Sequence, residues 1–189
     1  MKTAAGLGSS LLCGLIFCVG LARAAEKNEG HDQSIVIADG KLQLTAPKSW
    51  TRKEPQTSIV EYEFAIPAVE GDAQGGRMTV MGALGSIDAN IDRWKGQFSQ
   101  PDGENKDKAR IKKKQIAGLD VHLVDISGTF KDQRGPFAPA TERPNYRMLA
   151  AIIETKNTGN YFVKFYGPEK TVAKNEKAFN EMIESLEKK

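Results

Sequence analysis

The sequence has 189 residues, of which 40% are hydrophobic and 27% are charged, with a formal net charge of +3. This length suits one domain or two small ones, and the hydrophobic fraction is sufficient for a folded core. With 8 prolines and 18 glycines, the composition excludes a collagen-like chain and argues against a disordered one.

The first 24 residues have the composition of a secretory signal peptide. Lys2 gives a positive start, an uncharged apolar stretch follows, and Ala22-Arg23-Ala24 places small residues at the cleavage positions. Cleavage after Ala24 removes two of the basic residues and both cysteines, so the net charge falls to about +1. We therefore expect a protein exported to the periplasm or outside the cell.

Two alternatives to a cleaved signal remain open. The uncharged residues 3–22 are just long enough to stay in the membrane as an anchor, although glycines and serines weaken that stretch. A lipoprotein needs a small residue before the modified cysteine, whereas Cys13 follows Leu12 and Cys18 follows Phe17. Without cysteines, an exported domain of this size depends on its hydrophobic core for stability.

Residues 25–34 are polar and charged and are expected to form a flexible leader, after which a single domain spans residues 35–189. From residue 35 the dominant hydrophobic period is two, which predicts β-strands. The pattern is clearest where Val60 and Phe64 share one face while Glu61 takes the other. The first half of the domain is predicted to contain strands over residues 35–38, 41–46, 58–66 and 77–84.

A helix then interrupts the strands. Ser86 and Asp88 both suit the N-cap position, and apolar residues recur every three to four positions until residue 98. The apolar stripe of this helix consists of Ile87, Ile91, Trp94 and Phe98. We expect the stripe to pack against the sheet, with Trp94 buried there.

The second half of the domain returns to strands and ends in a helix. Ala117-Gly118 predicts a tight turn between two strands, and residues 131–145 are expected to form a long loop. The continuous apolar run over residues 148–153 is typical of a strand in the middle of a sheet. The predicted elements are strands over residues 110–116, 119–130, 146–154 and 161–166, and a closing helix over residues 169–188.

These elements together predict an α+β fold. Strands joined by tight turns pair in antiparallel fashion, and strands without a polar face need cover on both sides. We therefore expect an antiparallel sheet of six to seven strands sandwiched between helices.

Three segments carry a resemblance to a known family. They are LQLTAPKSW (residues 42–50), GSIDANIDRWKGQF (residues 85–98) and NYFVKFYGPEKTVAKNEKAFNEMIESL (residues 160–186). In position and pattern they are similar to the opening strand, the middle helix and the last strand with the closing helix of the PsbP-like family, named after an extrinsic photosystem subunit. The family has exported bacterial members. The resemblance implies an α/β/α fold and a non-enzymatic role in binding or in the assembly of larger complexes.

The residues that usually carry catalysis do not form a recognisable constellation. No Gly-x-Ser-x-Gly elbow follows the signal segment, and cleavage would remove every cysteine. Asp120 and His122 share one strand face and would begin a metal site with His31 or a loop carboxylate, but two ligands are also typical of an ordinary polar strand. We therefore predict neither an enzyme nor a cofactor or metal site.

The most basic stretch spans residues 106–114. Lys112 and Lys114 are candidates for an anion-binding patch that recognises phosphate or an acidic polysaccharide. The alternative is an edge strand whose lysines protect it from aggregation. Nucleic acid is not an expected partner of an exported domain that is nearly neutral.

The segment QRGPFAPATERPN (residues 133–145) is a second candidate for binding. Long ordered loops often carry function, and here Phe137 would be the anchor, with Arg134 and Arg143 as a polar rim. The alternative is that this loop only caps the sheet and buries Phe137.

The sequence favours a non-enzymatic binding or accessory protein that contacts a protein or envelope component through loops and a sheet edge. After signal cleavage no membrane span is expected. The alternatives are a carrier of a small apolar ligand held between sheet and helix, and an enzyme with an unrecognised site.

Overall fold

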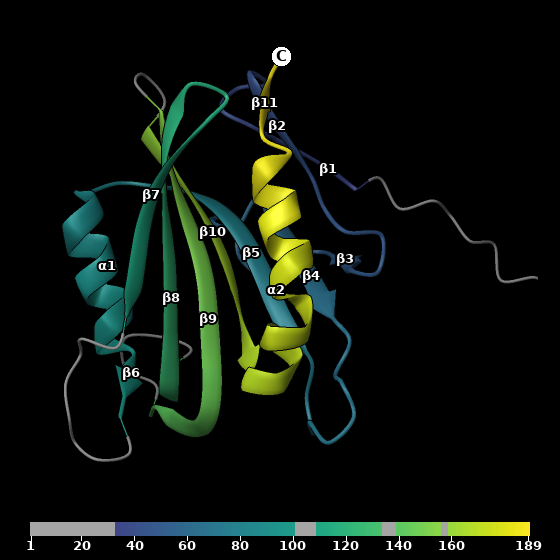
Figure 1. Cartoon of the computed structure of the whole chain (residues 1–189), viewed down its shortest axis with the longest axis vertical. Helices are drawn as coiled ribbons and strands as arrows, with labels where there is room; N and C mark the ends of the chain where they lie inside the picture. The colour runs from purple at the N-terminus through teal and green to yellow at the C-terminus, as the bar shows by residue number, and fades with distance from the viewer. Residues whose placement is uncertain (1–32, 101–108, 134–138, 156–158) are drawn as a thin grey trace, which may run out of the picture. The chain divides into compact units, whose positions relative to one another are not determined.

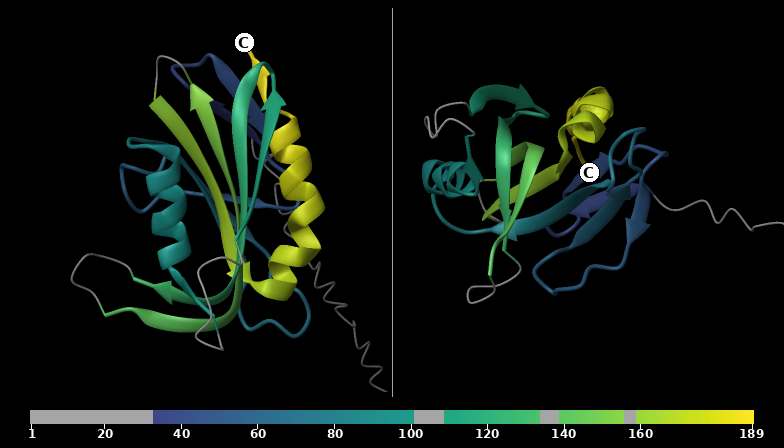
Figure 2. Two further views of the ribbon diagram at one scale, coloured as in Figure 1. Left: turned by 60° about the vertical axis from the view of Figure 1, so that its left-hand side comes forward. Right: turned by 90° about the horizontal axis from the view of Figure 1, so that it is seen from below.

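The computed structural model describes residues 33–100, 109–133, 139–155 and 159–189. They form a large antiparallel sheet, a small three-stranded sheet and two helices, α1 (Ile87–Gly96) and α2 (Glu169–Glu184). Figures 1 and 2 show the two helices on opposite sides of the large sheet. The predicted α+β fold with an antiparallel sheet between helices is confirmed. The large sheet has eight strands rather than six to seven.

The strands of the large sheet lie in the order β3-β4-β5-β10-β9-β8, and both β6 and β7 pair with the outer side of β8. The longest strands, β8 and β9, lie side by side near this end of the sheet. The bounds are β3 (Thr51–Lys53), β4 (Tyr62–Ile66), β5 (Gly76–Ala83), β6 (Phe98–Ser99), β7 (Arg110–Ile116), β8 (Leu119–Asp132), β9 (Thr141–Thr155) and β10 (Gly159–Pro168).

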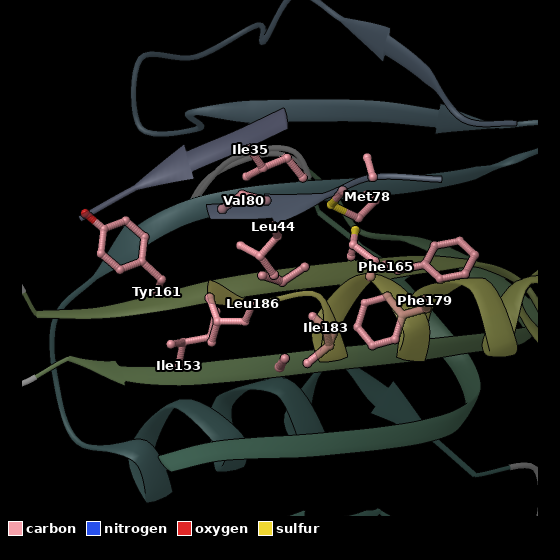
Figure 3. Close-up of a cluster of buried hydrophobic side chains, with 14 of the residues drawn as sticks. Ile35, Leu44, Met78, Val80, Ile153, Tyr161, Phe165, Phe179, Ile183 and Leu186 are labelled. Carbon is pink, nitrogen blue, oxygen red and sulfur yellow. The ribbon is translucent and has the colours of Figure 1, made fainter. Parts of the chain in front are cut away.

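One face of the large sheet, here called the α2 face, packs against α2 and the small sheet. The small sheet consists of β1 (Ser34–Ile37), β2 (Leu42–Thr45) and β11 (Glu187–Lys188). Figure 3 shows Leu44 of β2, Phe165 of β10 and Phe179 of α2 meeting in this core. The indole of Trp50 is buried beside Phe165 and donates a hydrogen bond to Asn175 of α2, at 3.1 Å.

The opposite face, here called the α1 face, packs against α1. The predicted stripe of this helix is confirmed for Ile87, Ile91 and Trp94, whereas Phe98 joins the same core from β6 because the helix ends at Gly96. Trp94 is 2% exposed and meets Phe162 of β10 edge to face, with the ring centroids 5.0 Å apart. Ser86 caps the helix, since its hydroxyl accepts a hydrogen bond from the backbone N–H of Ala89.

The middle strands are buried on both faces, as their apolar runs predict. Side chains along a strand alternate between faces, so in β9 Met148, Ala150 and Ile152 pack on the α1 face and their neighbours pack on the α2 face. The same alternation in β10 matters for the site: Val163 and Phe165 point to the α2 face, so the intervening Lys164 points to the α1 face.

The prediction of a long loop over residues 131–145 is wrong at both ends. β8 continues to Asp132 and β9 begins at Thr141. The sequence suggests a loop because Pro144 cannot donate to a ladder, but the strand accommodates it in an irregularity where the register shifts between Gly128 and Phe130. Asn145 next to it has a positive φ of 56°.

The closing helix is also shorter than predicted. It ends at Glu184 because the chain turns at Ser185, whose hydroxyl donates to the Met182 carbonyl and accepts from the Thr45 amide. Glu187 and Lys188 then pair with β2, and Leu186 between helix and strand is buried. Within the described ranges, neither helix is long and apolar enough to cross a membrane.

Candidate functional site

Polar side chains gather on the part of the α1 face that α1 leaves uncovered. They line a cleft of about 550 Å³, here called the α1-face pocket, which the ends of several strands and residues 56–60 enclose. Its charged and aromatic lining includes Glu63, Arg77, Arg143, Tyr146, Lys164 and Tyr166. These residues come from β4, β5, β9 and β10, so the backbone of the sheet fixes their spacing.

Arg77 forms the best-ordered contact of the pocket. Its guanidinium donates two hydrogen bonds to the carboxylate of Glu63, at 2.9 and 2.7 Å, and a third to the Tyr166 hydroxyl, at 2.9 Å. The hydrogen bonds to Glu63 raise the pKa of Arg77 above its ordinary value. A bidentate pair of this kind holds both groups in fixed positions.

Arg143 is held at another side of the pocket. It donates to Asp132 of β8 at 2.9 Å and to the side-chain oxygen of Gln74 at 3.3 Å. The hydrogen bond with Asp132 raises the pKa of Arg143. The Tyr146 hydroxyl lies 3.5 Å from the same Gln74 oxygen, so Gln74 links these two side chains.

Lys164 is the unusual charge in the pocket. Its ammonium donates a hydrogen bond to the side-chain oxygen of Gln97 at 3.1 Å and lies 5.8 Å from the Trp94 ring centroid and 5.5 Å from that of Tyr166. The described residues supply no carboxylate within ion-pair distance of it. Burial, together with the positive charges of Arg93 and Arg77, lowers the pKa of Lys164 to about 8.

The charges of the lining do not cancel. Arg77 and Arg143 are matched by Glu63 and Asp132, and Lys164 remains as an additional positive charge. The two tyrosines contribute ring faces and hydroxyl groups. An ammonium next to ordered guanidinium and phenol groups can bind a carboxylate or phosphate, and its neutral form is an amine nucleophile.

Of the three site residues predicted in the loop, one lies among the described residues, and it lines this pocket. Arg143, predicted as part of a polar rim, lines the pocket from β9 rather than from a loop. Phe137 and Arg134 lie outside the described residues, so their predicted roles stay predictions.

The predicted basic patch lies elsewhere. Lys112 and Lys114 of β7 line a separate cleft of about 490 Å³ between β7 and α2, together with Arg110 and Arg147. Most of these cations have acidic partners: Lys114 contacts Glu184 at 2.6 Å, and the two arginines share the carboxylate of Asp125.

The two arginines of this cleft stabilise the charged form of Asp125. Burial favours the protonated form of Asp125, but the hydrogen bonds from Arg147 and Arg110 outweigh burial and hold its pKa below the ordinary value. Lys112 is exposed, and the described residues give it no ion pair. The two clefts differ in how their unpaired cation meets solvent: Lys112 is exposed, whereas Lys164 of the α1-face pocket is largely shielded.

The residues considered for a metal site do not converge. His122 contacts Glu154, whereas Asp120 forms an ion pair with Lys113 at 2.6 Å. In the described ranges no three His, Cys, Asp or Glu side chains lie close enough together to hold a metal ion. His31 lies outside those ranges.

Sequence reasoning missed Lys164, although a signal for it exists. The run YFVKFY (residues 161–166) places one lysine in an otherwise apolar and aromatic strand. A strand in the middle of a covered sheet has no fully solvated face, so a lone charge there must be buried or face a cleft. Arg77 points to the same face from the neighbouring strand, but the sequence around it contains no comparable pattern.

Comparison with known proteins identifies the fold. No protein-family model and no curated protein matches the sequence. Among solved structures, the cyanobacterial PsbP (CyanoP) of Synechocystis sp. PCC 6803 matches with a TM-score of 0.50 and 9% identity, covering 83% of this chain and 92% of that chain. LpqN of Mycobacterium tuberculosis, described as involved in cell envelope biogenesis, matches with a TM-score of 0.49 and 8% identity, covering 82% of this chain and 88% of that one.

A protein of Bacteroides thetaiotaomicron is 17% identical, with a TM-score of 0.45 over 83% of this chain. The match spans only 48% of that longer protein. At these identities the comparisons concern the fold alone, and the expectation raised by the sequence segments is confirmed at that level. The described part of the chain has the PsbP-like fold.

Proposed function

We propose that this chain is an exported, non-enzymatic binding protein that holds an acidic group of a protein or other envelope component in the α1-face pocket. The observation that carries the proposal is Lys164, an ammonium packed under aromatic rings without a carboxylate partner among the described residues. A buried charge without a partner is unfavourable, so an incoming carboxylate or phosphate would gain from pairing with it.

The surroundings of Lys164 favour an anion over a cation. Arg93 and Arg77 add positive potential at its ammonium. Arg77 is already anchored by Glu63, so it contributes charge without having to rearrange. The hydroxyl groups of Tyr146 and Tyr166 lie in the same lining and would orient the bound group.

The export part of the proposal rests on the N-terminal pattern of residues 1–24. Arg143 and Gln133 also line the pocket and would contact the acidic partner. Phe137 stays a predicted anchor for the same partner.

The two rival functions receive less support from the described residues. Both helix–sheet interfaces are filled by packed side chains, and the α1-face pocket places several charged groups in its lining, which a wholly apolar cargo would leave without partners. Among its described lining residues the pocket has no histidine, cysteine or serine, so the nucleophile–histidine pair of a hydrolase is not assembled there.

The test compares capture by three forms of the purified protein from an envelope extract of its own host. Lys164→Met removes the proposed contact, and the double variant Lys112→Met with Lys114→Met removes the alternative basic patch. We expect Lys164→Met to weaken capture at least about tenfold, because losing one member of a desolvated charge pair is costly. We expect the double variant to bind like the parent.

Raising the pH through 8 should weaken capture by the parent, because the ammonium of Lys164 loses its charge there. Equal capture by Lys164→Met and the parent would refute the pocket. Loss of capture in the double variant alone would place the contact on the β7 edge.

A further inference from the structure

Lys164 also has the environment of a reactive amine. Only the neutral form of a lysine attacks a carbonyl carbon, and an ordinary exposed lysine is almost entirely protonated at neutral pH. What distinguishes Lys164 from the other described lysines is the combination of burial, cationic neighbours and an adjoining cleft large enough for a small molecule.

The charged groups that face Lys164 either lower its pKa or are already engaged in ion pairs with other residues. From the α1 side come the Arg93 guanidinium and the Trp94 ring, and from β5 comes Arg77. Glu63 of β4 is engaged by Arg77, and Asp132 of β8 by Arg143, so neither forms an ion pair with the ammonium. The remaining contacts of the Lys164 ammonium carry no charge: they are the side-chain oxygen of Gln97 and the ring of Tyr166.

The consequence for reactivity is large. With a pKa of about 8, Lys164 is neutral in roughly a quarter of the molecules at pH 7.5, against ~0.1% for a lysine with the ordinary value of 10.5. The Gln97 oxygen remains a hydrogen-bond acceptor for the neutral amine, so the side chain keeps its position when the proton leaves.

We propose that Lys164 forms an imine with a small anionic carbonyl compound, an aldehyde or ketone that carries a carboxylate, bound in the α1-face pocket. The amine nitrogen bonds to the carbonyl carbon, and the carbonyl oxygen takes up a proton to give a carbinolamine. Loss of that oxygen as water, with the second amine proton, leaves the imine. The step needs neither an oxidant nor a reductant.

The anionic group follows from the cations around Lys164 that stay charged when its amine is neutral. Arg93 and Arg77 both act on Lys164, and Arg93 contacts the amide of Asn90 and has no carboxylate partner among the described residues. A carboxylate next to the carbonyl would therefore raise the local concentration of the compound at the amine. The inference concerns a small molecule and does not depend on the macromolecular partner proposed above.

The test is reductive trapping with glyoxylate and cyanoborohydride on the purified protein, read by peptide mass spectrometry at pH 7.5. We expect Lys164 to be labelled at least tenfold faster than Lys112, an exposed lysine that serves as the internal control. The labelling rate of Lys164 should reach half of its maximum near pH 8. Labelling of Lys164 no faster than of Lys112 would overturn the proposal.

Two further measurements test whether the labelling depends on the negative charge of the compound and on the amine of Lys164. Formaldehyde, which is uncharged, should show a smaller preference for Lys164 than glyoxylate does, and an equal preference would overturn the role assigned to the anionic group. Lys164→Arg keeps the positive charge but cannot form the imine, so it should lose the fast labelling. Capture of the acidic partner is measured separately, on the parent protein. Failure of trapping alone is therefore distinguishable from failure of the proposed function.

Discussion

Replacing Lys164 by methionine should stabilise the protein at neutral pH. Lys164 is half-buried, its ammonium lies near Arg93 and Arg77 with no carboxylate partner among the described residues, and its pKa falls from 10.5 to about 8. A shift of this size corresponds to roughly 3 kcal/mol of free energy that disfavours the folded, charged state. Met keeps much of the length of the side chain without its charge. Loss of the hydrogen bond to Gln97 offsets about 1 kcal/mol, which leaves an expected gain of about 2 kcal/mol at pH 7.

The sign of the pH dependence follows from the same shift. Between pH 8 and 10.5 the unfolded chain binds the proton of Lys164 more tightly than the folded chain does, so the stability of the parent rises with pH relative to Lys164→Met. Above this interval both states hold a neutral amine, and the advantage of the variant disappears.

Urea denaturation of the parent, Lys164→Met and Lys112→Met at pH 7 and at pH 10 measures this difference. The exposed Lys112 is the matched control, and its replacement should change the free energy of unfolding by less than about 0.5 kcal/mol at either pH. A Lys164→Met variant that is less stable than the parent at pH 7 would refute the reasoning, as would a difference that does not change with pH.

Two further substitutions and one sequencing experiment test the core, the predicted anchor and the predicted signal cleavage. Trp94→Ala should lower the free energy of unfolding by about 3–5 kcal/mol in chemical denaturation, since Trp94 is 2% exposed, and a variant that melts like the parent would contradict its place in the core. Phe137→Ala should weaken partner capture by roughly 2 kcal/mol with unchanged melting if Phe137 is an anchor; reduced melting with unchanged capture would instead support a capping role. N-terminal sequencing of the native protein should begin at Ala25, and an intact Met1 would contradict the predicted cleavage.

Local patterns in the sequence were enough for most of the fold. The alternation over residues 62–66, the stripe through Trp94 and the turn at Ala117-Gly118 each depend on near neighbours, and the structure contains all three. The strand predicted from residue 58 begins only at Tyr62, and Val60 lines the α1-face pocket instead of sharing the face of Phe64. Ala117 and Gly118 both have positive φ, as a tight hairpin turn requires.

The features that the sequence did not predict depend on distant partners. β9 runs through Pro144 because its pairing with β8 tolerates a shift in register there, which no local pattern signals. The last turn expected of α2 is replaced by a short strand because β2, far away in sequence, offers a free edge and an amide for Ser185. Tertiary pairing outweighs local helix propensity at such ends.

The candidate site was predicted only in part for the same reason. Arg143 was selected from a segment rich in proline, and it lines the α1-face pocket. Lys164 was not selected, because its importance comes from what surrounds it: the ring of Trp94, the oxygen of Gln97 and the absence of an acid among the described neighbours. These groups are separated from it by about 70 residues along the chain.

A carbon NMR titration of the Lys164 Cε in the purified protein, assigned by comparison with Lys164→Arg, tests the central claim most directly. Both the proposed anion capture and the proposed imine depend on a Lys164 that is shielded from solvent and has no acidic partner among the residues that the structure describes. The account predicts a titration midpoint near 8 that moves upward when an acidic partner is bound, since a carboxylate favours the charged form. A midpoint in the ordinary range near 10.5, unchanged by the captured partner, would contradict it.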